Sequence, residues 1–333
     1  MTPGRCGRAG ACTCRRSSAT DARSRSGFPA SRDTWTFSVV GRSIREAGIG
    51  ERLTALKKTI DFGFRQFTRS WGPTIEWLLE PVRWFMINME RLMLNTPWPI
   101  VLAVFVLIAW AASRSVKVTG GVVLTLVLIG YFGMWEDSMR TIAMTVVATL
   151  LAIVLGIPIG IAMARSNRVQ AVINPVLDVM QTMPSFVYLI PVVMLLGIGR
   201  VPGLIAVMIY AIPPIIRLTN LGIRLVDKDV LEAADAFGSS SWQRLKNVQM
   251  PLALPTIMAG VNQTIMMALA MVVVASMIGV QGLGLPVLQA IANQYFTLGI
   301  FNGLAIVGIA IIFDRTSQAY GKRLQKHLET VHG

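Results

Sequence analysis

The sequence is poor in the side chains that build disulfides and metal sites. Its 333 residues include three cysteines and two histidines. The cysteines are Cys6, Cys12 and Cys14, whereas the histidines are His327 and His332 at the other end of the chain. Structural metal sites and disulfide frameworks need pairs of such residues at characteristic spacings, and no second pair follows here. We therefore expect a fold that owes nothing to disulfides or to structural metal.

Charged residues are also scarce. They make up 14% of the chain, and 53% of the residues are apolar, whereas an average soluble domain has about 25% charged residues. Long apolar runs follow residue 95, without the alternation of a membrane β-barrel, and they indicate an all-α polytopic membrane protein. The net charge is +14, but we expect no nucleic-acid partner, because no basic stripe with interleaved aromatic residues is present.

Motifs for catalysis are missing as well. The sequence contains no G-x-x-x-x-G-K-[ST] segment, which would cradle nucleotide phosphates. It offers no Ser/His/Asp or Cys/His set and no metal-ligand spacing for an enzyme site. We therefore expect a chain that is not an enzyme and that binds no cofactor of its own.

Composition divides the chain into five segments. We predict a disordered leader in 1–43, amphipathic interfacial or scaffold helices in 44–96, two peripheral transmembrane helices in 97–136, a core domain in 137–318 and a tail in 319–333. The leader is rich in Arg, Ser, Gly and Ala and has no apolar periodicity, which is typical of disorder. Its composition also leaves open that the start of translation is misassigned.

The second segment is rich in tryptophan. Trp71, Trp77 and Trp84 alternate with charged residues, a pattern typical of helices in the headgroup layer of a membrane. A helix packed on the rest of the protein would show the same pattern, so both interpretations stay open. Pro81 is expected to break or kink this helix.

Seven apolar runs predict membrane-spanning helices, taking about 20 residues as one span. They are residues 98–112, 118–134, 139–164, 172–196, 201–218, 256–279 and 297–313. With seven spans, the basic clusters around Arg114, Arg165, Arg224 and Lys322 fall on one side, and basic loops are typically cytoplasmic. This places the C-terminus in the cytoplasm and the N-terminus outside.

One predicted cytoplasmic loop, residues 226–252, is longer than the others. Asp229 is placed to cap a short helix, and Gly238 to end it in the left-handed conformation. Ser240 or Ser241 is placed to cap a second helix, which Pro251 stops. The sequence therefore predicts a helix–turn–helix at the inner face of the membrane. A loop with this much local order is typical of a docking surface.

The same loop carries a spaced motif. Its members are Glu232, Ala233, Ala234, Gly238, Val248, Met250 and Pro251. The motif resembles the EAA loop of binding-protein-dependent ABC importer permeases, with Val248 and Met250 in place of the usual Ile and Leu. Residues 178–191, 211–219 and 255–264 are similar to the glycine betaine/proline branch of that family. The resemblance covers about 130–320 closely and 60–130 loosely.

The resemblance implies a type I ABC importer permease fold and a transport function. The EAA loop is expected to dock as a coupling helix on a separate cytoplasmic ATPase, which binds and hydrolyses the ATP that drives alternating access. An extracytoplasmic substrate-binding protein is expected to deliver the substrate to a permease homodimer, surrounded by the lipids of the bacterial inner membrane. The implied substrates are compatible solutes such as glycine betaine, proline betaine, proline or choline, and the sequence leaves the choice among them open.

Polar residues inside the apolar spans are candidates for the translocation pathway. They are Gln181, Tyr188, Asn262, Gln263 and Ser276, with Asp178 as a further candidate. A structural role stays open for each, because amides often hydrogen-bond between membrane helices and Asp178 has Arg168 and Arg217 as possible partners. Gly156 and Gly160 predict a close contact between two helices.

Two other functions stay open. An ion-coupled osmolyte carrier that works alone would more often have inverted repeats and more spans, and would not need a long, capped loop. A scaffold or sensor without transport would have its active part in residues 44–95.

Overall fold

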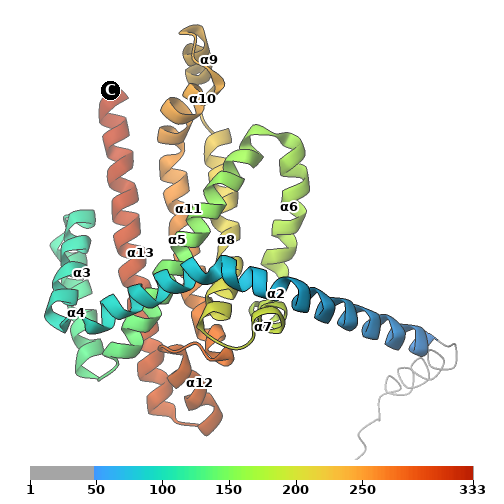
Figure 1. The fold of residues 1–333 in the computed structure, drawn as a ribbon. Coiled ribbons are helices and arrows are strands. Elements are labelled where there is room, and N and C mark those ends of the chain that lie inside the picture. Colours follow the sequence, from blue (N-terminus) through green and yellow to red (C-terminus); the bar gives the residue numbers. More distant parts are fainter. Residues whose placement is uncertain (1–48, 333) are drawn as a thin grey trace, which may run out of the picture. The chain divides into compact units, whose positions relative to one another are not determined.

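A computed structural model describes residues 49–332 of the chain, with side chains for residues 52–321. The predicted leader, 1–43, lies outside the described residues. Every regular element among the described residues is a helix (Figure 1). The chain divides at Phe64 into two compact units, and the second unit, residues 65–333, contains all helices after the first described one.

The first described helix, α2 (Ile49–Asn95), is 47 residues long and continues through Pro73 and Pro81. Pro81 therefore does not break the helix, and the alternative, a kink at Pro81, stays a prediction. Proline removes one backbone hydrogen bond from a helix, and packing of the helix can compensate for that loss. Met86 lies 4% exposed in the main apolar core, whereas Trp77 and Trp84 are exposed. The tryptophans thus lie on the face of α2 that points away from the core.

Two short helices follow, α3 (Trp98–Ser113) and α4 (Val116–Tyr131). Each has 16 residues, which corresponds to about 24 Å at 1.5 Å per residue, less than the roughly 30 Å of a bilayer core. The axis of α3 is bent by 110° from that of α2. Ala109, Val122 and Leu126 form a small apolar cluster with Ile312.

The centre of the second unit is α8 (Arg200–Arg224), which packs between α5 (Trp135–Arg165) and α11 (Met250–Ala275). Glycines make both contacts close. A Cβ atom on Gly160 of α5 would lie 2.6 Å from the Thr219 Cβ of α8, and one on Gly260 of α11 would lie 3.0 Å from the Leu218 Cβ. The predicted helix contact at Gly156 and Gly160 is confirmed.

Residues 172–196, predicted as one span, do not form a single straight helix. The chain forms α6 (Asn167–Thr182), a 3₁₀ turn (Ser185–Tyr188) and α7 (Leu189–Leu196), and the axis bends by 113°. The reason is Pro184, because the residue before a proline avoids the helical region. Met183 accordingly has an extended backbone with ψ 134°.

After α8 come α9 (Lys228–Ala236), α10 (Ser241–Gln243), a π-helical stretch (Arg244–Gln249) and α11. A 3₁₀ turn (Ser276–Ile278), α12 (Gly284–Asn293) and α13 (Phe296–His332) complete the chain. In Figure 1, α9 and α10 lie at one end of the second unit and α12 lies at the other. We call the end that carries α9 the coupling end and the end that carries α12 the opposite end.

Four helical segments of the described chain are long and apolar enough to cross a membrane: Trp135–Arg165, Arg200–Arg224, Ser241–Ile278 and Phe296–Gly321. The count rises to six if each bent pair, α2 with α3 and α6 with α7, forms one span. The multi-pass helical architecture is confirmed. The count of seven spans stays a prediction, because α4 alone is a shorter apolar helix.

Candidate functional site

The loop that carries the spaced motif folds as two short helices joined by a tight turn. The first helix, α9, is capped by Asp227, whose side chain accepts a hydrogen bond of 3.0 Å from the Asp229 backbone N–H. Asp229 itself, the predicted cap, lies within the first turn of the helix. The two residues compete for the same role, and Asp227 takes it because its backbone is extended.

Gly238 forms the turn after α9. Its φ of +75° lies in the left-handed region, as predicted, and its N–H bonds to the Asp235 carbonyl at 2.9 Å. No atom lies within 4 Å of the position that a Cβ would occupy there. The backbone conformation alone therefore selects glycine at this position.

The second helix begins with a complete capping box. The Ser240 N–H donates to Gln243 Oε1 at 2.9 Å, and the Gln243 N–H donates to Ser240 Oγ at 3.4 Å. Of the two predicted caps, Ser240 and Ser241, the first is confirmed. Reciprocal bonds of this kind satisfy two backbone donors at the helix start.

The sequence predicted that Pro251 stops the second helix, and this prediction was wrong. The π-helical stretch ends where the Met250 N–H bonds to the Leu245 carbonyl, and Pro251 then stands in the first turn of α11. Pro251 has no N–H to donate, and the π-helical stretch directly before it shifts the hydrogen-bond pattern at this point. The helix–turn–helix is therefore continuous with the long helix α11.

Two contacts hold the loop in one shape. Asp235 of α9 pairs with Arg244 at 2.6 Å, across the Gly238 turn. Leu245 is 2% exposed and lies in the same apolar cluster as Ile223 and Ile257. The ion pair thus joins α9 to the π-helical stretch, and the buried leucine fixes that stretch to α8 and α11.

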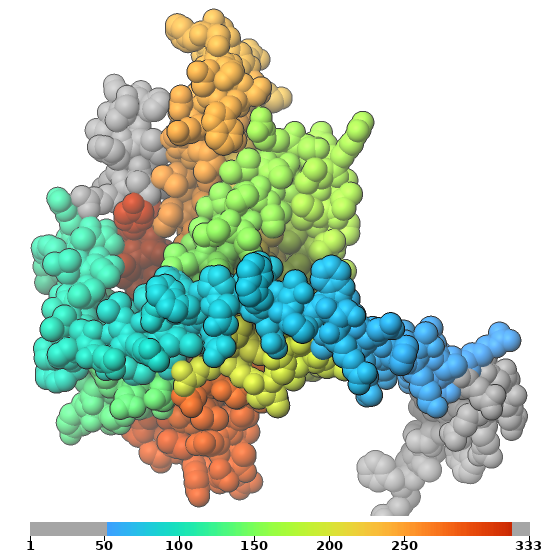
Figure 2. Space-filling model, in the orientation of Figure 1, coloured from blue at the N-terminus to red at the C-terminus, as the bar shows by residue number. Residues whose placement is uncertain are grey.

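The outer surface of the loop carries two exposed aromatic side chains among charged and polar residues. Phe237 is 91% exposed and Trp242 63% exposed, and Glu232 and Ala233 are also exposed. Figure 2 shows this segment projecting beyond the neighbouring helices at one end of the unit. We call Glu232, Ala233, Phe237 and Trp242 the coupling surface. Exposed aromatic residues beside small ones are typical of a docking site for another protein.

The remaining motif residues lie away from this surface. Ala234, Val248, Met250 and Pro251 are only partly exposed. Ala234 lies within α9, whereas Val248, Met250 and Pro251 stand where the loop joins α11, which suits residues that set the position of the loop.

The predicted pathway residues lie in separate places. Gln181 and Gln263 are exposed, and Ser276 is buried with its hydroxyl bonded to the Val273 carbonyl at 2.6 Å. Tyr188 is buried, donates to the Met180 carbonyl and meets Tyr210 edge to face, with ring centroids 5.7 Å apart.

Asp178 and Asn262 both bind other side chains. The sequence offered Arg217 as one possible partner of Asp178, but it did not indicate the partners of Asn262. Asp178 pairs with Arg217 of α8 at 2.5 Å. The Asn262 Nδ2 donates to the Asp314 carboxylate at 2.8 Å, and its Oδ1 accepts from the Ser317 hydroxyl at 2.5 Å. Asn262 thus bonds α11 to α13, which supports the structural interpretation of this residue.

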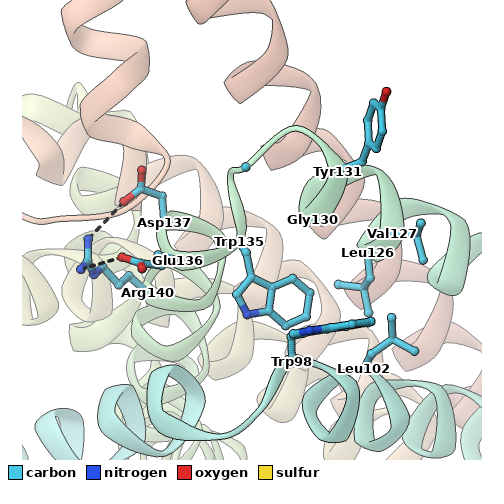
Figure 3. A pocket seen from close by; sticks show the side chains of 11 residues that line it. Trp98, Leu102, Leu126, Val127, Gly130, Tyr131, Trp135, Glu136, Asp137 and Arg140 are labelled. Atoms are coloured by element: carbon cyan, nitrogen blue, oxygen red, sulfur yellow. Dashed lines mark hydrogen bonds and ion pairs between the residues drawn. The ribbon is translucent and has the colours of Figure 1, made fainter.

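At the opposite end, a cavity of about 790 Å³ opens between α3, α4 and the beginning of α5. Figure 3 shows the indoles of Trp98 and Trp135 among the side chains that line it. Arg140 forms ion pairs with Glu136 and Asp137 at 3.6 and 3.3 Å on the other side of Trp135. Tryptophans at a helix end are typical of the membrane–water interface.

Comparison with known proteins identifies the family to which this chain is similar. Residues 156–326 match the family described as binding-protein-dependent transport system inner membrane component. The chain is 49% identical over 250 residues to the glycine betaine/proline betaine transport system permease protein ProW of Escherichia coli (strain K12), covering 75% of this chain and 70% of that protein. It is 49% identical over 201 residues to the glycine betaine/carnitine transport permease protein GbuB of Listeria monocytogenes serotype 1/2a (strain 10403S), covering 60% and 71%.

A solved structure supports the same fold. The chain is similar to one from the MetNI methionine ABC transporter in an inward-facing conformation, with a TM-score of 0.52 and 18% identity over 56% of this chain and 93% of that one. Residues 156–326, which match the family, include the capped loop between α8 and α11. This chain belongs to the family of inner membrane components of binding-protein-dependent transport systems, and it is a multi-pass permease component of an ABC importer.

Proposed function

We propose that this chain is the transmembrane permease subunit of an importer for a compatible solute such as glycine betaine, proline betaine, proline or choline. The support for the substrate class is the 49% identity to permeases named for glycine betaine, proline betaine and carnitine. The observation that carries the transport mechanism is the coupling surface, which presents two exposed aromatic side chains on a capped loop between two long membrane helices. The chain supplies no ATPase site of its own in this proposal.

The coupling surface is proposed to dock on a separate cytoplasmic ATPase, which binds and hydrolyses the ATP. Phe237 and Trp242 would be the anchors, since aromatic side chains dominate the energetics of protein interfaces. Glu232 would supply a charged contact. Because Asp235, Arg244 and Leu245 tie the loop to α8 and α11, a displacement of the loop would move both helices.

The orientation and the assembly follow from this docking. The coupling end faces the cytoplasm, the C-terminus lies on the same side and the N-terminus lies outside. A substrate-binding protein delivers the solute to the opposite end, and two copies of the chain form the pore. Within this assembly the homodimer is supported by the single complete loop in the chain, which gives each ATPase subunit one docking surface.

The test is uptake of radiolabelled glycine betaine into proteoliposomes that contain this chain with its ATPase and binding protein. Gly238→Val is the variant and Gly238→Asn the matched control. A β-branched residue is strongly disfavoured at a φ of +75°, and the left-handed conformation costs an ordinary residue roughly 1–2 kcal/mol, whereas Asn tolerates it. We expect uptake that requires ATP, is lost in Gly238→Val and is largely kept in Gly238→Asn.

Three other results would change the proposal. ATP hydrolysis stimulated by the binding protein without betaine uptake would keep the importer and reject the substrate. Normal uptake by a correctly inserted Gly238→Val variant would reject the role of the loop. Uptake by this chain alone, driven by an ion gradient, would replace the importer with an ion-coupled carrier.

A further inference from the structure

A partly buried carboxylate joins three helices at the opposite end of the second unit. Glu90 of α2 has a side chain that is only 12% exposed, and it lies between Arg200 of α8 and Arg140 of α5. Its Oε2 accepts a hydrogen bond of 2.7 Å from Arg200 Nη1, and its Oε1 is 3.7 Å from Arg140 Nε. Glu90 lies outside the residues matched by the family, so the contact joins an additional helix to the family core.

The turn before α12 belongs to the same cluster. Arg200 Nη2 donates to the Gln281 Oε1 at 2.6 Å, and the Leu283 N–H donates to Thr141 Oγ1 at 2.9 Å. A Cβ on Gly282 would lie 2.6 Å from that Thr141 oxygen. The ends of α5 and α8, the 279–283 turn and α2 therefore meet around one carboxylate.

The two arginines depend on Glu90 to different degrees. Arg140 has two further carboxylates within reach, Glu136 at 3.6 Å and Asp137 at 3.3 Å. Arg200 has no other ion-pair partner among the described side chains than Glu90, and keeps only the Gln281 amide when Glu90 is removed. Loss of the Glu90 charge thus leaves Arg140 compensated and Arg200 without a counter-charge.

The chemistry of this contact differs from that of the helix contacts deeper in the core. Gly160 and Thr219 pack so closely that the helices cannot separate there without losing apolar contact. An ion pair next to water can exchange partners, because its net free energy is small. Arg200 is 41% exposed, so water can replace Glu90 around its guanidinium.

We propose that Glu90 is a positioning residue of the transport cycle. Bound to Arg200, it holds α2 against the ends of α5 and α8 and keeps this end of the core closed. It releases Arg200 when the end opens toward the binding protein. The proposal rests on the proposed function, because opening and closing of this end is the step in which alternating access would use it.

A distance measurement tests the closure without requiring transport. Spin labels are placed at the exposed positions Trp84 of α2 and Ile198 of the turn before α8, in a chain whose three native cysteines are replaced by serine. The complete importer is reconstituted in nanodiscs without nucleotide, with labelled chains diluted by unlabelled ones. Glu90→Gln is compared with Glu80→Gln, an equal change on the same helix at a side chain that is 63% exposed.

We expect Glu90→Gln to raise the population with the longer distance about fivefold, the lower end of usual coupling effects. In proteoliposomes that contain the same variants, the ATP hydrolysed per substrate imported should rise by a similar factor. The added change Arg200→Gln should have little further effect, since both variants remove the same contact. Glu80→Gln should behave as the wild type.

Two outcomes would overturn the proposal. One is a Glu90→Gln distance distribution and ATP-to-substrate ratio equal to those of Glu80→Gln. The other is a lower thermal stability of Glu90→Gln with both quantities unchanged, which would make the contact a structural anchor only. If the wild type shows no ATP-dependent uptake, the proposed function fails, whereas the distance measurement still reports whether Glu90 closes this end.

Discussion

The contact between α5 and α8 at Gly160 gives a prediction whose size follows from the structure. A Cβ on Gly160 would lie 2.6 Å from Thr219 Cβ and 2.8 Å from the Ile216 carbonyl oxygen. Carbon atoms in contact prefer about 3.5–4.0 Å, so the helices would have to move apart by roughly 1 Å. Neither obstacle can turn away, because one is backbone and the other is a branched carbon at 0% exposure.

Gly160→Ala is therefore expected to destabilise the protein by about 1–3 kcal/mol, the usual cost of overpacking. Gly120→Ala in α4 is the matched control, since no atom lies within 4 Å of its Cβ position. That change should be neutral or slightly stabilising, because Ala favours a helix more than Gly does. The midpoint of thermal unfolding in detergent is the measurement, with uptake in proteoliposomes as the second readout.

The reasoning about this contact would be refuted by equal unfolding midpoints for Gly160→Ala and Gly120→Ala. A lower midpoint with full uptake would show that the contact stabilises the fold without setting the position of the loop. We expect both quantities to fall, because α8 leads directly into the helix–turn–helix and a shift of α8 displaces the coupling surface.

Three further predictions concern the loop and its neighbouring helices. Ser240→Ala should cost about 1 kcal/mol of local stability, because it removes one half of the capping box; faster hydrogen exchange in the loop than in Ser241→Ala would verify this, and equal exchange would contradict it. Phe237→Ser should weaken binding of the ATPase about tenfold, as loss of an interface anchor does, and an unchanged dissociation constant by surface plasmon resonance would remove Phe237 from the docking site. Asn262→Ala should lower the thermal midpoint more than Gln263→Ala does, because Asn262 bonds α11 to α13; the opposite order would argue against the structural role.

Local sequence signals predicted the loop well. A left-handed glycine at 238 and the cap at Ser240 follow from the backbone preferences of single residues, and the structure confirms both. Apolar runs likewise predicted the long helices α5, α8, α11 and α13, since about 20 apolar residues need a bilayer or a core. Two local signals failed: Asp227 caps α9 in place of Asp229, and Pro251 lies inside a helical segment that continues. Whether a proline ends a helix depends on the packing around it, which the residue itself does not specify.

The sequence did not indicate which polar side chains bind each other. Asn262 and Asp314 are 52 residues apart, and Glu90 and Arg200 are 110 apart. The only hint of the second pair was that Arg200 is an isolated charge in its loop.

Composition, run lengths and turn-forming residues thus determined by themselves that this chain is a helical membrane protein with a capped loop between two long helices, because each of those properties is local. The tertiary structure alone decided which helices touch, that α6 and α7 bend apart, and that Glu90, Arg140 and Arg200 converge. Those results depend on contacts between residues distant in the chain, and such contacts are selected by packing and charge in three dimensions.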